Sequence, residues 1–298
     1  MSFREKLKSA KRIVVKVGTS TLIHENGNIN LARIEKLTRA LSEMINLEKE
    51  VVLVSSGAIG VGISKLKLKN KPQSIREKQA VASVGQCELM FMYDKMFAEF
   101  GHTVGQFLIT KRDVDNDECR ENLINAFEKT FEYGAIPIIN ENDAVAVEEI
   151  VFGDNDSLSA IVAKLIKADA LLILTDIDGL YDKDPHKDED ARIIPVVEEI
   201  TEHLFEIAGG KGSKFGTGGM ITKLQAAQIA TEVGIPTIVM NGGDSDNIYR
   251  VLEGHQVGTF FTATHKFKYE IINDLKIFKK NILYTMKKYN NAYIITKD

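Results

Sequence analysis

Short runs of aliphatic residues alternate with longer segments of helical periodicity, and this alternation restricts the possible folds more than any other feature of the chain. The aliphatic runs predict buried strands at residues 13–17, 51–54, 104–109, 136–139, 170–174 and 236–240. Helical segments are predicted at 31–47, 76–100, 122–133, 158–167, 221–233 and 247–252. Strands that alternate with helices in this way are typical of a mostly parallel sheet covered by helices. We therefore predict an α/β protein.

The longest helical segment, residues 76–100, is rich in methionine and aromatic side chains. We interpret these side chains as part of the hydrophobic core rather than as a cofactor site, because methionine and aromatic residues at helical spacing commonly fill cores. The positions predicted to face the core are Ala80, Val84, Cys87, Met90, Phe91, Met96 and Phe97.

The composition excludes several classes of protein. The 298 residues are 44% hydrophobic and 27% charged, as in an ordinary globular protein of one or two domains. A net charge of −4 argues against a nucleic-acid partner. Cys87 and Cys119 are too few for a disulfide framework, and no apolar run is long enough to cross a membrane. The charged N-terminus lacks the apolar core of a signal peptide. We predict a cytoplasmic protein without a membrane partner.

The C-terminal end differs in composition from the rest of the chain. Residues 266–298 contain eight lysines but only three acidic residues. We predict a main domain over residues 1–265, followed by a basic extension over 266–298 that packs on the domain or between subunits; the alternative is a tail that binds an acidic surface.

Two polar clusters follow the predicted strand at 136–139. The first reads NEND, and the second, GDND, begins ten residues after Asp143. Because ligands of parallel sheets bind beyond the carboxyl ends of the strands, the clusters predict a crevice for a small amino-acid-like ligand, or groups that orient lysines. A plain turn is the alternative, since Asn, Asp and Gly are also common in turns. The polar residues concerned are Asn140, Glu141, Asn142, Asp143, Asp154, Asn155 and Asp156.

Lysines and glycines follow or interrupt other predicted strands. Lys16 lies within the first strand, where a buried lysine needs a partner or a ligand; the alternative is an edge strand with Lys16 in solvent. The second strand ends in SSGAIGVG, a turn at which backbone amides can meet an anion, although its glycine order is not that of a dinucleotide fingerprint. The segment 205–220 holds six glycines and leads into a helix with Lys223 in its first turn, which suits a phosphate cradle or, alternatively, a flexible linker.

Together these strand-end residues favour phosphoryl transfer. The chain has no GxSxG sequence and no histidine beside Ser56, which argues against acyl-enzyme chemistry. Two lysines from distant segments can neutralise charge on both sides of a moving phosphoryl group. A carboxylate acceptor is already a competent nucleophile, so the absence of a candidate general base is compatible with this reaction.

Six motifs in succession resemble those of the glutamate 5-kinases of the amino-acid kinase family. They are VVKVGTS (14–20), VSSGAIGVG (54–62), PIINENDAVA (137–146), GDNDSLSA (153–160), TDIDGLYDKDP (175–185) and GTGGMITKLQAA (216–227). The resemblance covers residues 10–262 and implies a three-layer α/β/α sandwich with a mostly parallel central sheet. It also implies the use of ATP and Mg²⁺ to convert L-glutamate to L-glutamyl 5-phosphate, the first step of proline biosynthesis.

The resemblance further implies roles for individual residues. Lys16 is expected to bridge the phosphates, Lys223 to act on the leaving side, and Asp154 and Asp156 to organise these lysines or the substrate ammonium, with Asp154 counted as catalytic. No residue is expected to be a dedicated metal ligand. The implied ATP contacts are Lys16, Gly18, Thr175, Asp176, Thr217, Gly218, Gly219, Met220, Ile221, Thr222 and Lys223. The implied glutamate contacts are Ser56, Gly57, Asn140, Asp143, Asn155 and Asp156.

The resemblance also leaves alternatives open. Many glutamate 5-kinases carry a C-terminal PUA domain, and residues 263–298 are too short and too different for one, so we expect a kinase domain alone, as a dimer or tetramer, with possible feedback inhibition by proline. Aspartate, acetylglutamate, carbamate and uridylate kinases share the scaffold. A non-catalytic amino-acid sensor would be expected to have lost Lys16 or Lys223. An RNA-associated protein would need the aromatic residues of the basic extension in a defined fold.

Overall fold

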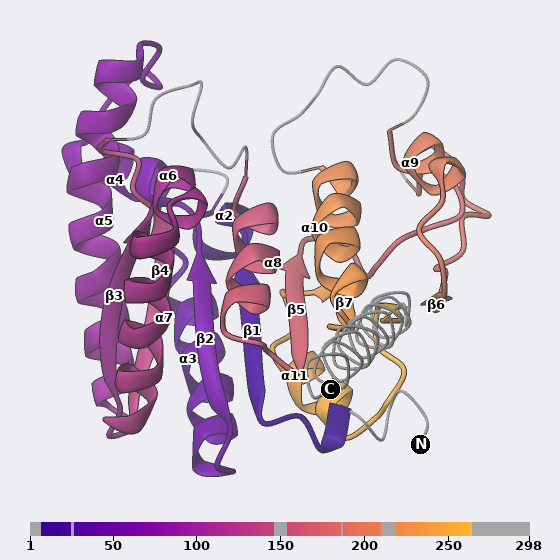
Figure 1. Cartoon of the computed structure of the whole chain (residues 1–298). Helices are drawn as coiled ribbons and strands as arrows, with labels where there is room; N and C mark the ends of the chain where they lie inside the picture. Colours follow the sequence, from indigo (N-terminus) through magenta and orange to yellow (C-terminus); the bar gives the residue numbers. More distant parts are fainter. Residues whose placement is uncertain (1–6, 25–26, 146–153, 186, 210–218, 264–298) are drawn as a thin grey trace, which may run out of the picture.

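A single sheet organises the computed structural model of the chain, which describes residues 7–24, 27–145, 154–185, 187–209 and 219–263. Its strand order is β3-β4-β2-β1-β5-β7-β8-β6, and all paired neighbours are parallel except β7 and β8 (Figure 1). The strands are β1 (Arg12–Val17), β2 (Glu50–Ser55), β3 (Thr103–Ile109), β4 (Ala135–Glu141), β5 (Ala170–Thr175), β6 (Val196–Val197), β7 (Thr237–Asn241) and β8 (Thr259–Phe261).

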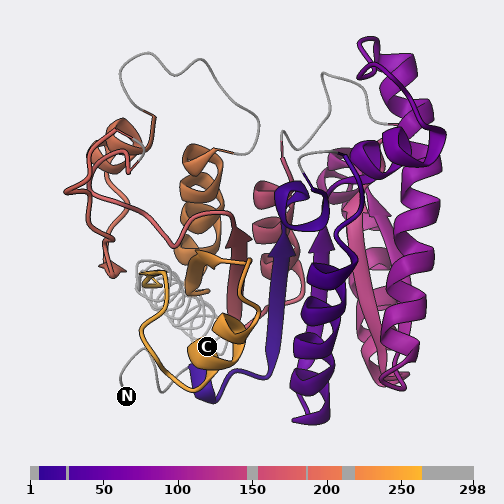
Figure 2. The same cartoon turned by 180° about the vertical axis from the view of Figure 1, so that it is seen from behind.

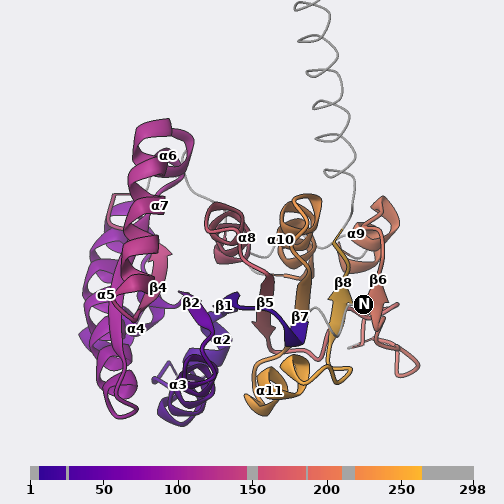
Figure 3. The ribbon, with the colours of Figure 1, turned by 60° about the horizontal axis from the view of Figure 1, so that its bottom comes forward.

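Helices cover both faces of this sheet. They are α2 (Thr19–Leu22), α3 (Leu31–Asn46), α4 (Ala58–Leu66), α5 (Ile75–Ala98), α6 (Lys111–Asp115), α7 (Asp117–Glu132), α8 (Asn155–Leu165), α9 (Glu202–Gly209), α10 (Met220–Glu232) and α11 (Asp246–Leu252). Helices α7, α8 and α10 lie on one face, and α3 and α11 on the other (Figure 3). Seen from behind, α3 lies in front of the strands (Figure 2). The predicted three-layer α/β/α sandwich is confirmed.

The two faces of the sheet bury separate hydrophobic cores. Ile13 and Val15 of β1 pack with side chains of α3 and α5, whereas Val14 packs with side chains of α8 and α10. Successive side chains of a strand point to opposite faces. Lys16, two residues after Val14, therefore projects to the α8 and α10 face.

The interior position of β1 decides the environment of Lys16. The strand pairs with β2 on one side and with β5 on the other, so that Lys16 lies opposite Val54 and Ile173. The Lys16 residue is only 6% exposed. The alternative of an edge strand with a solvated lysine is therefore wrong, and the buried ammonium group requires a partner.

The predicted strands and helices are all present, but several begin or end elsewhere. The predicted helix 122–133 begins at Asp117, because the side chain of Asn116 accepts a hydrogen bond from the Cys119 amide and caps the helix. The predicted helix 158–167 begins at Asn155 in the same way, with Asp154 as its cap. The short strands β6 and β8 were not predicted, because two or three residues carry too little pattern.

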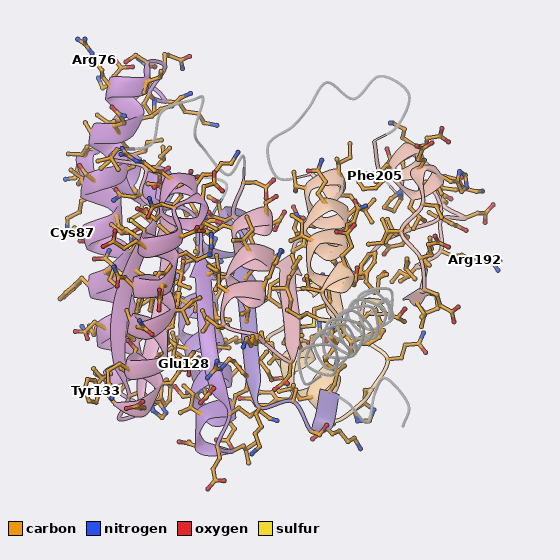
Figure 4. All side chains as sticks on the ribbon, viewed as in Figure 1. Arg76, Cys87, Glu128, Tyr133, Arg192 and Phe205 are labelled. Carbon is orange, nitrogen blue, oxygen red and sulfur yellow. The ribbon has the colours of Figure 1, made fainter. Side chains whose placement is uncertain are left out.

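The core-facing side of α5 differs from the prediction. Phe91 is 62% exposed, and Cys87 lies on the outer side of the helix (Figure 4). The buried side chains of α5 are Val81, Ala82, Gln86, Leu89, Met92, Tyr93 and Phe97. A polar residue, Gln86, therefore occupies a position on the inner face of this helix.

Two glycines set the position of α5 against α4. A Cβ atom on Gly85 would lie 1.7 Å from the Ala58 carbonyl oxygen, and one on Gly62 would lie 2.0 Å from the Val81 carbonyl oxygen. Both obstacles are backbone atoms, which cannot rotate aside as a flexible side chain can. Glycine at these positions allows the two helices to pack backbone against backbone, next to the turn that follows β2.

Some predictions fall on residues outside the described part of the chain. These residues include 210–218, with the predicted ATP contacts Thr217 and Gly218, and 264–298, so the predicted domain division at 265/266 stays a prediction. Among the described residues, no helix has the length and apolar character needed to cross a membrane.

Candidate active site

A cavity of about 770 Å³ opens at the carboxyl ends of the central strands. The arrowheads of β2 and β5 point to this same edge of the sheet (Figure 1). Ligands of open parallel sheets bind at this edge, as the polar clusters predicted. The predicted site residues that line the cavity are Lys16, Gly18, Ser56, Gly57, Asn140, Asp143, Asp154, Asn155, Asp156, Thr175, Asp176 and Lys223.

A fully buried carboxylate joins the two predicted catalytic lysines. Lys16 Nζ lies 2.6 Å from Asp156 Oδ1, and Lys223 Nζ lies 3.1 Å from Asp156 Oδ2. Thr222 Oγ1 donates a hydrogen bond of 2.7 Å to Asp156 Oδ2. Lys16 and Lys223 are 6% and 5% exposed, and both line the cavity. The fold thus brings two ammonium groups from distant segments to one carboxylate.

Three elements on one face of the sheet produce this group of charges. Lys16 projects from β1, Asp156 lies in the first turn of α8, and Lys223 lies in the first turn of α10. Helices α8 and α10 lie side by side over that face (Figure 3). Gly219 precedes α10 and provides no side-chain cap, and the Thr222 amide of the first turn donates to the Gly219 carbonyl at 3.2 Å.

Burial and mutual charge shift the pKa values within this group. Burial lowers the pKa of Lys16, an effect that Asp156 opposes and Lys223 reinforces. Burial alone would raise the pKa of Asp156, but the two lysines outweigh it and hold the pKa below its usual value. Asp156 is therefore ionised at neutral pH, and the group carries a net positive charge when both lysines are protonated.

Neutral side chains form the other end of the cavity. Asn155 Nδ2 lies 2.9 Å from the Ser55 carbonyl oxygen, 3.0 Å from Ser56 Oγ and 2.9 Å from Asn140 Oδ1. Asn140 Nδ2 in turn donates a hydrogen bond of 2.8 Å to Gln86 Oε1. These contacts connect the ends of β2 and β4 with the start of α8 and the inner face of α5.

The turn after β2 exposes backbone amides to the cavity. Gly57 has φ of 96°, in the left-handed region that glycine adopts without strain, and it precedes α4. The first amides of a helix have no intrahelical partners. Ala58 and Ile59 of α4 line the cavity, so these amides can receive an anionic group.

Two partly buried carboxylates, Asp143 and Asp154, also line the cavity. Burial raises the pKa of Asp143. Burial also raises the pKa of Asp154; a hydrogen bond from the Ser157 amide opposes this rise, and the charge of Asp156 adds to it. Asp154 therefore has a structural role as the cap of α8 in addition to its place on the cavity wall.

The predicted nucleotide contacts are brought together only in part. Thr175 Oγ1 donates to Asp176 Oδ1 at 3.0 Å at the end of β5, and a Cβ on Gly18 would lie 3.6 Å from Lys16 Nζ. Met220 and Ile221 belong to the first turn of α10 but are not among the residues that line the cavity.

Several residues at or behind the cavity wall are not among the predicted site residues. Thr19 and Ser20 follow Gly18 within the VVKVGTS motif, which was a usable signal. Lys71 reaches the wall from the loop between α4 and α5, and Gln86 lies behind Asn140. No local pattern distinguishes these last two residues, because only the packing of α4 and α5 brings them to the site.

Comparison with known proteins identifies the family. Residues 11–241 match the model of the amino acid kinase family. The chain belongs to this family. Among its relatives, a protein named glutamate 5-kinase from Clostridium perfringens (strain 13 / Type A) is 55% identical over 264 residues, which are 87% of this chain and 98% of the relative. A glutamate 5-kinase from Clostridium acetobutylicum is 51% identical over 267 residues, which cover 89% of this chain and 100% of that protein.

Solved structures agree on the architecture of this amino acid kinase. The UMP kinase from Bacillus anthracis has a TM-score of 0.59 at 16% identity, covering 85% of this chain and 96% of that one. An isopentenyl phosphate kinase from T. acidophilum has a TM-score of 0.58 at 16% identity, covering 84% of this chain and 100% of that one. At this level of identity the likeness shows the fold alone.

Proposed function

We propose that this amino acid kinase uses ATP to phosphorylate the γ-carboxylate of L-glutamate, giving L-glutamyl 5-phosphate in the first step of proline biosynthesis. Support for the substrate comes from the relatives named glutamate 5-kinase, which this chain matches over nearly their whole length. The structural observation that carries the reaction type is the contact of Lys16 and Lys223 with the same buried carboxylate at the cavity.

The charged end of the cavity suits in-line phosphoryl transfer. The transferred group carries its negative charge on oxygens that preorganised cations can neutralise. We assign Lys16 and Lys223 to this task, with Asp156 holding both ammonium groups in place. The γ-carboxylate of glutamate attacks the terminal phosphorus of ATP, the bond from this phosphorus to the bridging oxygen breaks, and ADP leaves with the electron pair of that bond. No proton has to be removed from the nucleophile.

The nucleotide is proposed to lie over the carboxyl end of β5 and the start of α10. Gly18, Thr175 and Asp176 are assigned to this part of the site, together with residues 219–223; Thr217 and Gly218, outside the described residues, stay predicted ATP contacts. Mg²⁺ is proposed to enter with the ATP phosphates, because it usually keeps several waters and needs few protein ligands. The carboxylate of Asp154 on the cavity wall fits contact with such a hydrated ion. When bound, the ion neutralises phosphate charge.

The neutral end of the cavity is proposed to hold the amino-acid part of the substrate. Asp143 offers a carboxylate to the α-ammonium group, and Ser56, Asn140 and Asn155 offer hydroxyl and amide groups at hydrogen-bonding reach of one another. Gly57 allows the turn that exposes the first amides of α4. These contacts do not change during the reaction, so we expect them to determine affinity and selectivity for the substrate.

Trapping with hydroxylamine tests the proposed reaction directly. The protein is incubated with ATP, Mg²⁺, hydroxylamine and each of a set of carboxylic amino acids, including glutamate, aspartate and acetylglutamate. Acyl phosphates react with hydroxylamine to give hydroxamates, which are coloured with iron(III). Hydroxamate from glutamate with matching ADP release supports the proposal. Preference for another acceptor would assign the chain to a different substrate, and no ATP-dependent product with any of them would favour an amino-acid sensor.

Several further properties belong to the same proposal. We propose a homo-oligomer, dimer or tetramer, with feedback inhibition by proline; size-exclusion chromatography and rates measured with added proline test these points. The cytoplasm is the proposed compartment, since the exposed thiols of Cys87 and Cys119 suit a reducing environment. Residues 1–265 are proposed to be the kinase domain, with 266–298 as an appended segment.

A further inference from the structure

A chain of buried amide groups connects α5 with the amino-acid end of the cavity. Gln86 and Asn140 are only 8% and 2% exposed. Gln86 Oε1 accepts from Asn140 Nδ2 at 2.8 Å, and Asn140 Oδ1 accepts from Asn155 Nδ2 at 2.9 Å. Gln86 lies behind the cavity wall, so any effect it has on a ligand must act through these two asparagines.

Two backbone groups, one bonded to Asn140 and one to Asn155, determine the direction of every bond in this chain. The Glu141 amide can only donate, and it donates to Asn140 Oδ1 at 2.9 Å. This contact turns Asn140 Nδ2 towards Gln86, which must then present its oxygen. At the other end, the Ser55 carbonyl can only accept, so Asn155 Nδ2 faces it.

This polarity leaves one oxygen available at the cavity. Asn155 uses its nitrogen for the contacts with Ser55, Ser56 and Asn140, and Asn155 Oδ1 has no hydrogen-bond partner among the described residues. Asn155 lines the cavity together with Asp143, whose carboxylate also has no ion-pair partner in the described part of the chain. An amide oxygen and a carboxylate that line the same cavity can both accept hydrogen bonds from an ammonium group.

The close packing of α5 makes Gln86 a rigid support. Gly85, the preceding residue, allows the helix backbone to contact the Ala58 carbonyl of α4, and α4 directly follows the Ser56–Gly57 turn. The amide chain and the turn are therefore held to the same pair of helices. The helices have no free space between them, so a larger residue at Gly85 would push α5 away from α4. Gln86 would then move with α5, away from Asn140.

We propose that Gln86 is a positioning residue for the amino-acid end of the site, which holds Asn140 and, through it, Asn155 in the orientation that presents Asn155 Oδ1 to the substrate ammonium. The inference rests on the proposed function and adds to it a residue that does not touch the substrate. Without the Gln86 acceptor, Asn140 Nδ2 is left buried and unpaired, and this cost opposes the orientation that the Glu141 amide sets for Asn140. A shift of Asn140 weakens its contact with Asn155, which then depends on Ser55 and Ser56 alone for its orientation.

The test compares Gln86→Met and Gln86→Glu with the wild type. Methionine fills a similar space but offers only a weakly accepting sulfur, whereas a glutamate side chain keeps an oxygen at the same reach. We expect Gln86→Met to raise KM for glutamate about tenfold, equivalent to about 1.4 kcal/mol of binding, with kcat and KM for ATP changed less than threefold. Contacts made equally in the ground state and the transition state alter KM in this way. Gln86→Glu is expected to stay within threefold of the wild-type KM for glutamate.

Tyr93→Phe is the matched control on the same helix. It removes the 2.8 Å contact between the buried Tyr93 hydroxyl and Ser55 Oγ but leaves in place the Ser55 carbonyl that holds Asn155, and its KM for glutamate should not change. The proposal would be overturned by an unchanged KM for glutamate in Gln86→Met, or by an equal rise in this KM in Tyr93→Phe. A tenfold rise in KM for glutamate in Gln86→Glu would also overturn it, and this variant decides if Gln86→Met does not fold. The wild type in the same assay tests the function itself, since only a failed function abolishes its activity with glutamate.

Discussion

The two ends of the cavity are built from different kinds of interaction. At one end, Lys16, Lys223 and Asp156 form a buried group of full charges. At the other end, Asn140 and Asn155 belong to a chain of neutral amides. The ends meet in the first turn of α8, where Asn155 belongs to the neutral end and its neighbour Asp156 to the charged end. Charge that stabilises a moving phosphoryl group and hydrogen bonds that select a substrate can therefore be altered separately.

The largest effect should come from removing either lysine. We expect Lys16→Ala and Lys223→Ala each to lower kcat by roughly 10²–10³-fold, because a preorganised positive charge at the transition state is lost. KM for glutamate should change less than tenfold, since its contacts lie at the neutral end. Steady-state kinetics with coupled detection of ADP measures both values. Lys36→Ala, an exposed lysine on α3, is the control. Near-normal turnover in either lysine variant would refute the assignment.

Asp156→Asn tests the structural role of the buried carboxylate. Loss of this carboxylate removes the ion pairs that it makes with two buried ammonium groups, and we expect the free energy of unfolding to fall by about 3–5 kcal/mol at pH 7. Because the two lysines lower the pKa of Asp156 below its unfolded value of about 3.9, its contribution is complete above about pH 4 and is lost as the pH falls through the folded pKa. Urea unfolding is measured at pH 7 and below about pH 4. The difference in unfolding free energy between variant and wild type should be smaller at the lower pH. An equal difference at the two pH values would contradict this account.

Gly85→Ala should affect the neutral end through packing alone. The added methyl group would lie 1.7 Å from the Ala58 carbonyl oxygen, so the two helices must separate. We expect a loss of about 1–3 kcal/mol in unfolding free energy, with a higher KM for glutamate because Gln86 moves with α5. Thermal melting and kinetics measure the two effects. Ser83→Ala, on the exposed side of α5, should leave both unchanged. Full stability of the Gly85 variant would show that the helices can separate at no cost.

The smallest predicted effect concerns the carboxylate at the neutral end. Asp143→Asn should raise KM for glutamate roughly tenfold, as expected for loss of one charge-assisted contact. Burial raises the pKa of Asp143, so this carboxylate is protonated at a higher pH than an exposed aspartate. Protonation removes the charge that attracts the ammonium group. In the wild type, KM for glutamate should therefore rise as the pH is lowered towards this pKa. A pH profile of KM for glutamate tests this, and the Asn variant should lack that rise. An identical pH profile in both proteins would remove Asp143 from the proposed ammonium contacts.

Local sequence patterns predicted the layers of the fold and most of the cavity wall. The aliphatic run at 13–17 indicated β1, and the residues after 136–139 indicated a ligand crevice, because polar residues directly after a buried strand mark its open end. The same local reasoning placed Phe91 in the core and overlooked Gln86. Hydrophobic spacing identifies a helix, but the partners of each of its sides depend on contacts with α4 that are distant in the sequence.

The sequence by itself determined which segments become strands and helices and which residue types lie at the strand ends, because these properties depend on neighbours along the chain. Only the tertiary structure decided that Lys16 lies in an interior strand, that Asp156 contacts both lysines, and that Gln86 supports Asn140. These outcomes depend on strand order and on the distance between helices. Both are set by packing of segments far apart in the chain, for which one sequence contains no local signal.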